Sequence, residues 1–186
     1  MKRWGVLISG RGSNLSSLID LRASSDDFNI RVVMSSSETA YGLLRARRAG
    51  LPTTITPFLS GTKKIDWPAL TAELRERGVT HIFLAGFMKI LPEKFLSDWA
   101  GRIINLHPSL LPYYPGIRSL ERAFEDGAAL GVTVHEVIKE VDAGEVICQR
   151  ITLATPKDHG YSLCEFLVHI DEQRAVKEAI RLWINR

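Results

Sequence analysis

The chain has 186 residues, 45% of them hydrophobic and 24% charged, with a formal net charge of +3 at pH 7, which is typical of one globular domain. No apolar stretch reaches the ~18 residues that span a bilayer, so the sequence excludes a membrane-spanning protein. The basic residues are dispersed rather than interleaved with aromatic ones, which argues against nucleic-acid binding, and the two cysteines make neither a disulfide framework nor a metal-binding spacing.

Short apolar runs alternate with helix-like segments through the first half of the chain. The elements expected there, in order, are strand Trp4–Ser9, helix Asn14–Ala23, strand Ile30–Ser35, helix Ala40–Ala49, strand Thr53–Thr56, a helix capped by Asp66 that runs to Arg77, and strand His81–Ala85. Strands that alternate with helices in this way predict a parallel sheet.

The alternation continues in the second half. The elements expected there are helix Pro92–Trp99, strand Ile103–His107, helix Ile117–Asp126, strands Gly131–Ile138 and Val146–Leu153, and a last helix that opens with a capping box of Ser162 and Glu165 and runs to about Asn185. Seven residues, Lys139–Glu145, separate the last two strands. This is too few for a parallel crossover, so the pair should be antiparallel.

The sequence therefore predicts an α/β fold in a single domain over residues 1–186. The expected architecture is a Rossmann-like, mostly parallel sheet with helices on both faces and an antiparallel C-terminal strand pair. Ligands of such sheets bind beyond the carboxyl ends of the strands, so candidate site residues should follow Ser9, Ala85 and His107.

The first of these places carries the sequence Gly10-Arg11-Gly12-Ser13-Asn14 between a strand and a helix. Glycines and free N–H groups at a helix start make an anion site, although a tight strand–helix turn explains the same glycines. Leu15 stands where a dinucleotide-binding fingerprint needs glycine. A single phosphate, rather than a pyrophosphate, is the candidate ligand.

Asn105 and His107 form the second candidate, because residues two apart in a strand share a face. Pro108 places both at the carboxyl end of the strand. An amide beside an imidazole can stabilise an oxyanion and move protons, and a buried histidine satisfied by hydrogen bonds is the other interpretation. Asp142 would orient the imidazole and raise its pKa if it lies close, but it also fits a solvated turn. His135 is open to both interpretations.

Five segments carry a resemblance to a known family: Leu7–Leu15, Leu84–Leu91, Asn105–Pro112, Gly131–His135 and Val141–Gly144. Together, and in the same order, they resemble the glycinamide ribonucleotide formyltransferases among the folate-dependent formyltransferases. The resemblance implies transfer of a formyl group from 10-formyltetrahydrofolate, as co-substrate, to the amine of glycinamide ribonucleotide in de novo purine biosynthesis. It implies neither a metal nor a covalent intermediate.

The resemblance also implies a role for particular residues. Asn105, His107 and Asp142 match the catalytic trio of the family. The substrate phosphate and ribose are expected at Gly12, Ser13, Asn14, Lys64 and Glu172. The folate is expected at Met88, Lys89, Ile90, Leu91, Glu140, Val141, Ala143 and Gly144, largely through main-chain groups. His135 and Arg118 are expected elsewhere in the pocket.

Some positions depart from the family pattern. Arg118 and Leu120 stand where histidine and another polar residue are usual. Lys89 replaces a common arginine, and Ser36 replaces a usual asparagine. These differences lie near the expected pocket, and we expect Arg118 to add positive charge beside the formyl acceptor.

Three other functions stay open at this point. They are formyl transfer to an amino-sugar nucleotide, hydrolysis of 10-formyltetrahydrofolate by water, and non-catalytic ligand binding on the same fold. Small-molecule substrates are the expected partners, with no nucleic acid and no membrane, and we expect a monomer or homodimer. The apolar run Val6–Ile8 is too short for a secretory signal, so we expect a cytoplasmic protein.

Overall fold

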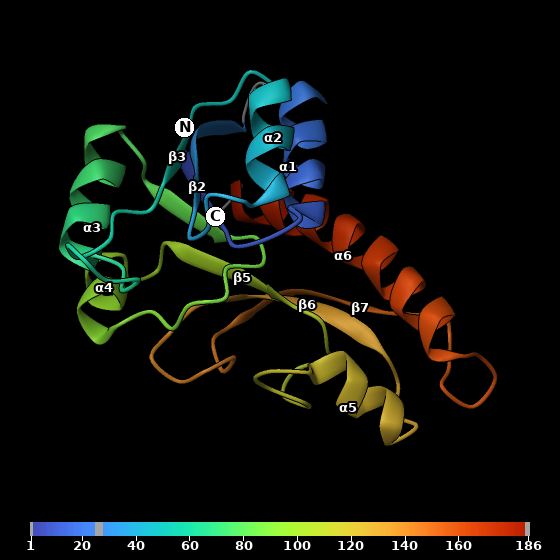
Figure 1. Cartoon of the computed structure of the whole chain (residues 1–186). Helices are drawn as coiled ribbons and strands as arrows, with labels where there is room; N and C mark the ends of the chain where they lie inside the picture. The colour runs from blue at the N-terminus through green and yellow to red at the C-terminus, as the bar shows by residue number, and fades with distance from the viewer. Residues whose placement is uncertain (1, 25–27, 185–186) are drawn as a thin grey trace. The chain divides into compact units, whose positions relative to one another are not determined.

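The computed structural model describes residues 2–24 and 28–184, which fall into two compact units, residues 1–103 and 104–186 (Figure 1). The first unit contains β1 (Arg3–Ile8), α1 (Ser13–Ser24), β2 (Asn29–Ser35), α2 (Tyr41–Arg48), β3 (Thr53–Ile55), α3 (Trp67–Glu76), β4 (His81–Leu84) and α4 (Glu93–Asp98). The second contains β5 (Ile103–His107), whose first residue ends the first unit, and then α5 (Ser119–Glu125), β6 (Gly131–Glu136), β7 (Val146–Ile151) and α6 (Tyr161–Ile184).

The first unit holds a parallel sheet with the strand order β3-β2-β1-β4. β1 and β2 are buried along most of their length, as expected of parallel strands that are covered on both faces. Because parallel crossovers are right-handed, α1 and α2 should cover one face and α3 the other. Figure 1 shows α1 and α2 together on one side of these strands and α3 on the opposite side.

Acid should destabilise the first unit through His81, at the start of β4. The His81 ring packs against Trp4, with centroids 5.3 Å apart. Burial, assisted by the positive charges of Lys2 and Arg102, lowers the pKa of His81 from 6.5 to about 4. The unfolded chain therefore binds a proton more readily than the folded chain. The contribution of His81 to the free energy of unfolding is present above the pKa that it has in the unfolded chain, and is lost as the pH falls through the pKa that it has in the folded chain.

The free energy of unfolding, measured from neutral pH down to about pH 4, tests this effect of His81. It should fall with pH in the unmodified protein and fall less steeply in His81→Gln, which has no titrating ring. Equal slopes for the two proteins would show that His81 is not responsible.

The second unit has the strand order β5-β6-β7, with β6 antiparallel to both neighbours. α6 packs against β6 and β7, where the Cys148 thiol donates to the Ala175 carbonyl at 3.4 Å and the Thr152 hydroxyl donates to Asp171 Oδ2 at 3.0 Å. The apolar face of α6 supplies Val168, Val176 and other side chains to the core of this unit.

The α/β class, with parallel strands, helices on both faces and antiparallel C-terminal strands, is confirmed. The N-cap predicted at Asp66 is also confirmed, since its carboxylate accepts the Ala69 N–H at 3.0 Å. The single domain over residues 1–186 stays a prediction.

Several predicted boundaries were wrong. α5 begins at Ser119 rather than Ile117, because Arg118 has a φ of 53°, which a helix does not accommodate. The capping box at Ser162 is wrong, since α6 begins at Tyr161 and the Gly160 carbonyl accepts the first helical N–H groups. β7 ends at Ile151 instead of Leu153, and the expected helix end at Asn185 lies outside the described residues.

Candidate active site

The pairing of β5 with β6 sets the geometry of the candidate site in the second unit. The antiparallel register places Asn105 opposite His135 and His107 opposite Thr133. Side chains that lie opposite each other in this way share one face of the sheet. Asn105 Nδ2 accordingly lies 3.4 Å from His135 Nε2. Both histidines are almost fully buried, with 5% of His107 and 1% of His135 exposed.

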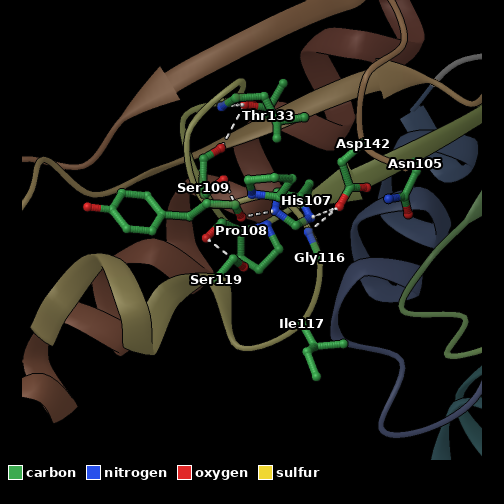
Figure 2. A network of polar contacts seen from close by, with 12 residues as sticks. Asn105, His107, Pro108, Ser109, Gly116, Ile117, Ser119, Thr133 and Asp142 are labelled. Carbon is green, nitrogen blue, oxygen red and sulfur yellow. Dashed lines mark hydrogen bonds and ion pairs between the residues drawn. The ribbon is translucent and has the colours of Figure 1, made fainter. Parts of the chain in front are cut away.

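Asp142 completes this group from the loop that joins β6 to β7. Its Oδ2 lies 3.3 Å from His107 Nδ1, and its Oδ1 lies 3.5 Å from His135 Nε2. The side chain of Asp142 is 11% exposed. Figure 2 shows Asn105, His107 and Asp142 gathered in one place, so the carboxylate is not a solvated turn residue.

Two main-chain groups of one loop hold the His107–Asp142 pair. His107 Nε2 donates to the Tyr114 carbonyl at 2.9 Å, and the Gly116 N–H donates to Asp142 Oδ2 at 2.8 Å. Tyr114 and Asp142 both have positive φ, at 54° and 53°. Such a conformation costs a non-glycine residue about 1–3 kcal/mol and persists where surrounding contacts over-determine it. It occurs at the residues that contact both ring nitrogens of His107, which makes this loop cluster a candidate functional site.

The hydrogen bonds of the two histidines leave the second nitrogen of each ring facing Asp142. Each ring donates one N–H to a carbonyl, His107 to Tyr114 and His135 Nδ1 to Glu136 at 2.8 Å. A neutral imidazole has one donor and one acceptor nitrogen, so each neutral ring would turn a lone pair towards Asp142. His135 can use its lone pair to accept from Asn105. A proton on His107 Nδ1 would therefore convert a repulsion with Asp142 into a charge-assisted hydrogen bond.

Opposing influences act on the pKa values of this pair. Burial lowers the pKa of His107, while the Tyr114 carbonyl and the Asp142 carboxylate raise it, and the net shift is downward. Burial raises the pKa of Asp142, but its interactions with the His135 side chain and with the Gly116 N–H outweigh burial and lower the pKa overall. Asp142 is therefore ionised at neutral pH, and any imidazolium that forms at His107 is a stronger acid than free imidazole.

Thr133 fixes the segment that leads away from His107. Its buried hydroxyl donates to the Ser109 carbonyl at 2.7 Å (Figure 2). The same hydroxyl accepts from the Leu111 N–H at 3.1 Å. Gln149 on β7 donates to the same hydroxyl at 2.8 Å and to the Leu111 carbonyl at 2.9 Å. These bonds tie the residues after His107 to the sheet, and so they hold the imidazole in register.

The predicted phosphate-binding segment lies at the start of α1 in the first unit. Gly12 has a φ of 71°, and a Cβ there would lie 2.7 Å from Gly42 Cα, so only glycine fits. The Gly12 carbonyl accepts the Ser16 N–H at 3.1 Å, which leaves the N–H groups of the first helical turn without intrahelical acceptors. Asn14 Oδ1 is buried and, within the described residues, has no hydrogen-bond partner. This segment can bind an anion.

Ser9 joins that segment to the predicted folate-binding loop. The Ser9 N–H donates to the Gly86 carbonyl at 3.1 Å, and its hydroxyl accepts the Met88 N–H at 2.9 Å and lies 2.7 Å from the hydroxyl of Ser36. The side chains of Met88 and Ile90 are exposed, at 79% and 89%. Two large apolar side chains in water, on a loop anchored by hydrogen bonds, suit contact with a flat ligand.

The other predicted site residues lie in separate places within their units. Lys64 is exposed in the 57–65 loop of the first unit. Glu172 is buried on α6, where it accepts from His169 Nδ1 at 2.7 Å. Arg118 is exposed just before α5, and its guanidinium lies 3.6 Å from Glu125. A Cβ at Gly144 would collide with the Glu136 carbonyl oxygen, so this glycine sets the path of the loop that carries Asp142.

The arrangement of Asn105, His107 and Asp142 can be compared with that of known proteins. A family model described as formyl transferase matches residues 2–180. The chain belongs to the formyl transferase family. Its similarity to the family extends through both units and includes every residue of the buried histidine and carboxylate group.

Named relatives are similar along most of the chain. The phosphoribosylglycinamide formyltransferase of Dictyostelium discoideum is 38% identical over 197 residues, which cover 95% of each protein. The trifunctional purine biosynthetic protein adenosine-3 of Chironomus tentans is 41% identical over 186 residues, covering 97% of this chain. This chain spans only 14% of the length of that trifunctional protein.

A solved structure of the family confirms the Rossmann-like fold. The crystal structure of phosphoribosylglycinamide formyltransferase from Anaplasma phagocytophilum has a TM-score of 0.89 to this chain at 37% identity. The match covers 99% of this chain and 87% of the chain in that crystal structure. Across the described parts of the chain, no helix combines the length and apolarity needed to cross a membrane, and no group of three or more metal-ligating side chains is placed to hold an ion.

Some groups at this candidate site are missed by reasoning from sequence. The Tyr114 carbonyl and the Gly116 N–H act through the main chain, so residue type does not reveal them. The Pro115-Gly116 pair indicates a turn, but not what the turn contacts. The sequence alone allows two interpretations of His135, because its place beside Asn105 and Asp142 depends on strand register.

Proposed function

We propose that this protein transfers a formyl group from 10-formyltetrahydrofolate to the amine of glycinamide ribonucleotide, a step of de novo purine biosynthesis. The observation that carries the proposal is a continuous group of contacts: Asp142 lies 3.3 Å from His107 and 3.5 Å from His135, and His135 lies 3.4 Å from Asn105. Membership of the formyl transferase family, and relatives named phosphoribosylglycinamide formyltransferase, support the substrate.

Asn105 and His107 are proposed to stabilise the charge that develops during transfer. As the amine attacks the formyl carbon, the carbonyl electrons move to the formyl oxygen, and donors aimed at that oxygen lower the barrier. Asn105 Nδ2 has two N–H groups, of which His135 accepts one. His107 donates to the Tyr114 carbonyl, so its part in the reaction requires that an N–H be shared with the formyl oxygen.

Asp142 is proposed to assist the proton transfers of the reaction. The amine loses a proton as its bond to the formyl carbon forms, and the nitrogen that leaves must gain one. Asp142 is ionised and lies against both histidines, so it can hold His107 in its protonated form and pass the proton through water. 10-Formyltetrahydrofolate supplies the activated formyl group. Covalent attachment to the protein is not needed.

Binding roles are proposed for the remaining residues. Gly12, Ser13 and Asn14 would bind the substrate phosphate through the free N–H groups at the start of α1, with Lys64 adding charge. Glu172, buried and ionisable, would accept hydrogen bonds from the ribose. The folate would contact main-chain groups of 88–91 and of Glu140, Val141, Ala143 and Gly144, where the exposed Met88, Ile90 and Val141 offer apolar surface. Lys89 belongs to the same proposed set.

Arg118 should influence the acceptor rather than the folate. We propose that its guanidinium adds positive charge for a phosphorylated acceptor, although its exposed pairing with Glu125 screens part of that charge. Arg118→Ala should raise the KM of glycinamide ribonucleotide about twofold to tenfold and leave the folate KM unchanged. Steady-state kinetics with each substrate varied in turn will measure this. An increase in the folate KM alone would contradict the proposal, because it would mean that Arg118 affects folate binding and not the acceptor.

The proposed partners are these two small-molecule substrates, with no nucleic acid and no membrane. The proposed state of the protein is a cytoplasmic monomer or homodimer.

One experiment separates the possible activities. The purified protein is given 10-formyltetrahydrofolate with glycinamide ribonucleotide, with an amino-sugar nucleotide, or with water alone, and loss of the formyl group is followed. A rate that depends on glycinamide ribonucleotide supports the proposal. Loss of formyl with water alone would make the protein a hydrolase, and dependence on the amino sugar would change the acceptor.

A further inference from the structure

Arg122 is an exposed residue of α5 that holds the loop preceding its own helix. Its Nη1 donates to the Pro115 carbonyl at 2.8 Å and to the Ile117 carbonyl at 3.3 Å. Its guanidinium carbon lies 5.6 Å from the centre of the Tyr114 ring. The Tyr114 hydroxyl donates to Asp126 Oδ2 at 3.0 Å, just after the helix. Arg122 and Asp126, in and just after the last turn of α5, therefore fasten residues 114–117 by side-chain contacts.

The residues fastened in this way are those that hold the His107–Asp142 pair. The Tyr114 carbonyl accepts from His107 at 2.9 Å, and the Gly116 N–H donates to Asp142 at 2.8 Å. The two carbonyls bonded to Arg122 belong to residues directly after each of these groups. A displacement of this stretch of main chain would move the partners of the imidazole and of the carboxylate together.

The backbone of this loop needs such external contacts. Tyr114, Gly116 and Arg118 have φ values of 54°, 81° and 53°, so every second residue is in the left-handed region. Non-glycine residues keep this conformation only where their surroundings over-determine it. Two hydrogen bonds and a cation–π contact from one guanidinium are contacts of that kind. Without Arg122, the loop would be free to relax towards ordinary backbone angles.

We infer that Arg122 is a positioning residue: by tying the Pro115 and Ile117 carbonyls to α5, it fixes the loop that aligns His107 with Asp142. Its effect on the reaction rests on the proposed formyl transfer, whereas its effect on the loop does not. Arg122 touches neither the imidazole nor the carboxylate. It acts through the main chain of the loop that separates it from them.

Kinetics test the catalytic consequence. Arg122→Met keeps the length of the side chain but loses its donors and charge, and a misplacement of about 1 Å in a site can cost about 10²-fold in rate. We expect kcat to fall about 10- to 100-fold with both KM values nearly unchanged. Arg122→Lys keeps a charge and donors but loses the planar guanidinium, and should recover part of kcat. Arg181→Met, which removes an exposed arginine from the last turn of α6, should behave like the unmodified protein.

Hydrogen exchange of the Gly116 N–H provides a readout that needs no activity. In the ligand-free protein this amide should exchange about tenfold faster in Arg122→Met than in the unmodified protein, because its bond to Asp142 is less well held. Amides of β6 should keep their rates. Arg122→Lys should give a Gly116 rate between those of Arg122→Met and the unmodified protein, and Arg181→Met should leave that rate unchanged.

The outcomes distinguish the two proposals. Faster Gly116 exchange together with a lower kcat supports the positioning role. If Gly116 exchanges faster in Arg122→Met but the unmodified protein shows no formyl transfer, the proposed function is contradicted and the positioning role is still supported. Unchanged exchange and unchanged kcat in an active Arg122→Met protein would overturn the positioning role. Equal acceleration of the β6 amides would overturn it as well, since that result indicates general destabilisation.

Discussion

Replacing Asp142 with asparagine should lower kcat about 10³-fold, the scale expected for loss of a group that orients and exchanges protons. The substitution removes the negative charge that faces His107 Nδ1 at 3.3 Å and His135 Nε2 at 3.5 Å. Without it, the imidazolium of His107 loses the carboxylate that opposes the effect of burial on its pKa. The pKa of His107 would then be lowered further, so the imidazole would be harder to protonate when the formyl oxygen gains charge.

Asp142→Asn is a conservative change for the fold. Asparagine tolerates the left-handed conformation that Asp142 adopts, and its amide oxygen can still accept the Gly116 N–H. The thermal midpoint should therefore stay close to that of the unmodified protein while kcat collapses. Steady-state kinetics beside thermal unfolding measure both quantities. A folded Asp142→Asn protein that retains kcat within about tenfold would remove Asp142 from the mechanism.

His107→Ala should lower kcat about 10²- to 10³-fold, which is the usual cost of removing one donor from an oxyanion site. The buried imidazole leaves a space lined by polar groups, among them the Tyr114 carbonyl and Asp142. Free imidazole added to this variant should enter that space and restore part of the rate. A role in packing alone would lower stability without such rescue.

A matched histidine controls for loss of a ring elsewhere. His159→Ala changes a histidine in the turn before α6, where its contacts are with Thr155. It should leave kcat near that of the unmodified protein. Turnover at the same near-normal rate in folded His107→Ala would contradict a role for His107 in charge stabilisation.

The sequence predicts more of the scaffold than of the site. Apolar runs and helical periodicity were enough for the strand and helix order, because parallel strands buried on both faces have a distinctive composition. Errors came where backbone conformation decides a boundary, as at Arg118 and Ser162. A residue in the left-handed region is not visible in the hydrophobic pattern.

Part of the candidate site is also predictable from the sequence. Alternation along a strand places Asn105 and His107 on one face, which follows from sequence spacing. The approach of Asp142 and His135 depends on strand register and on a loop with positive φ, and residue types do not specify either. The residues leave Asp142 open between a partner of His107 and a solvated turn, and the resemblance to a family favours the partner. The structure adds the main-chain contacts of Tyr114 and Gly116.

The kcat of the double variant His107→Ala/Asp142→Asn, set beside the two single variants, is the most direct measurement of whether these side chains work as one unit. Groups that act together give strongly non-additive losses, because removing either one disables the other. We predict a kcat within about threefold of the slower single variant. Multiplication of the two single losses in the double variant would mean that the imidazole and the carboxylate act independently.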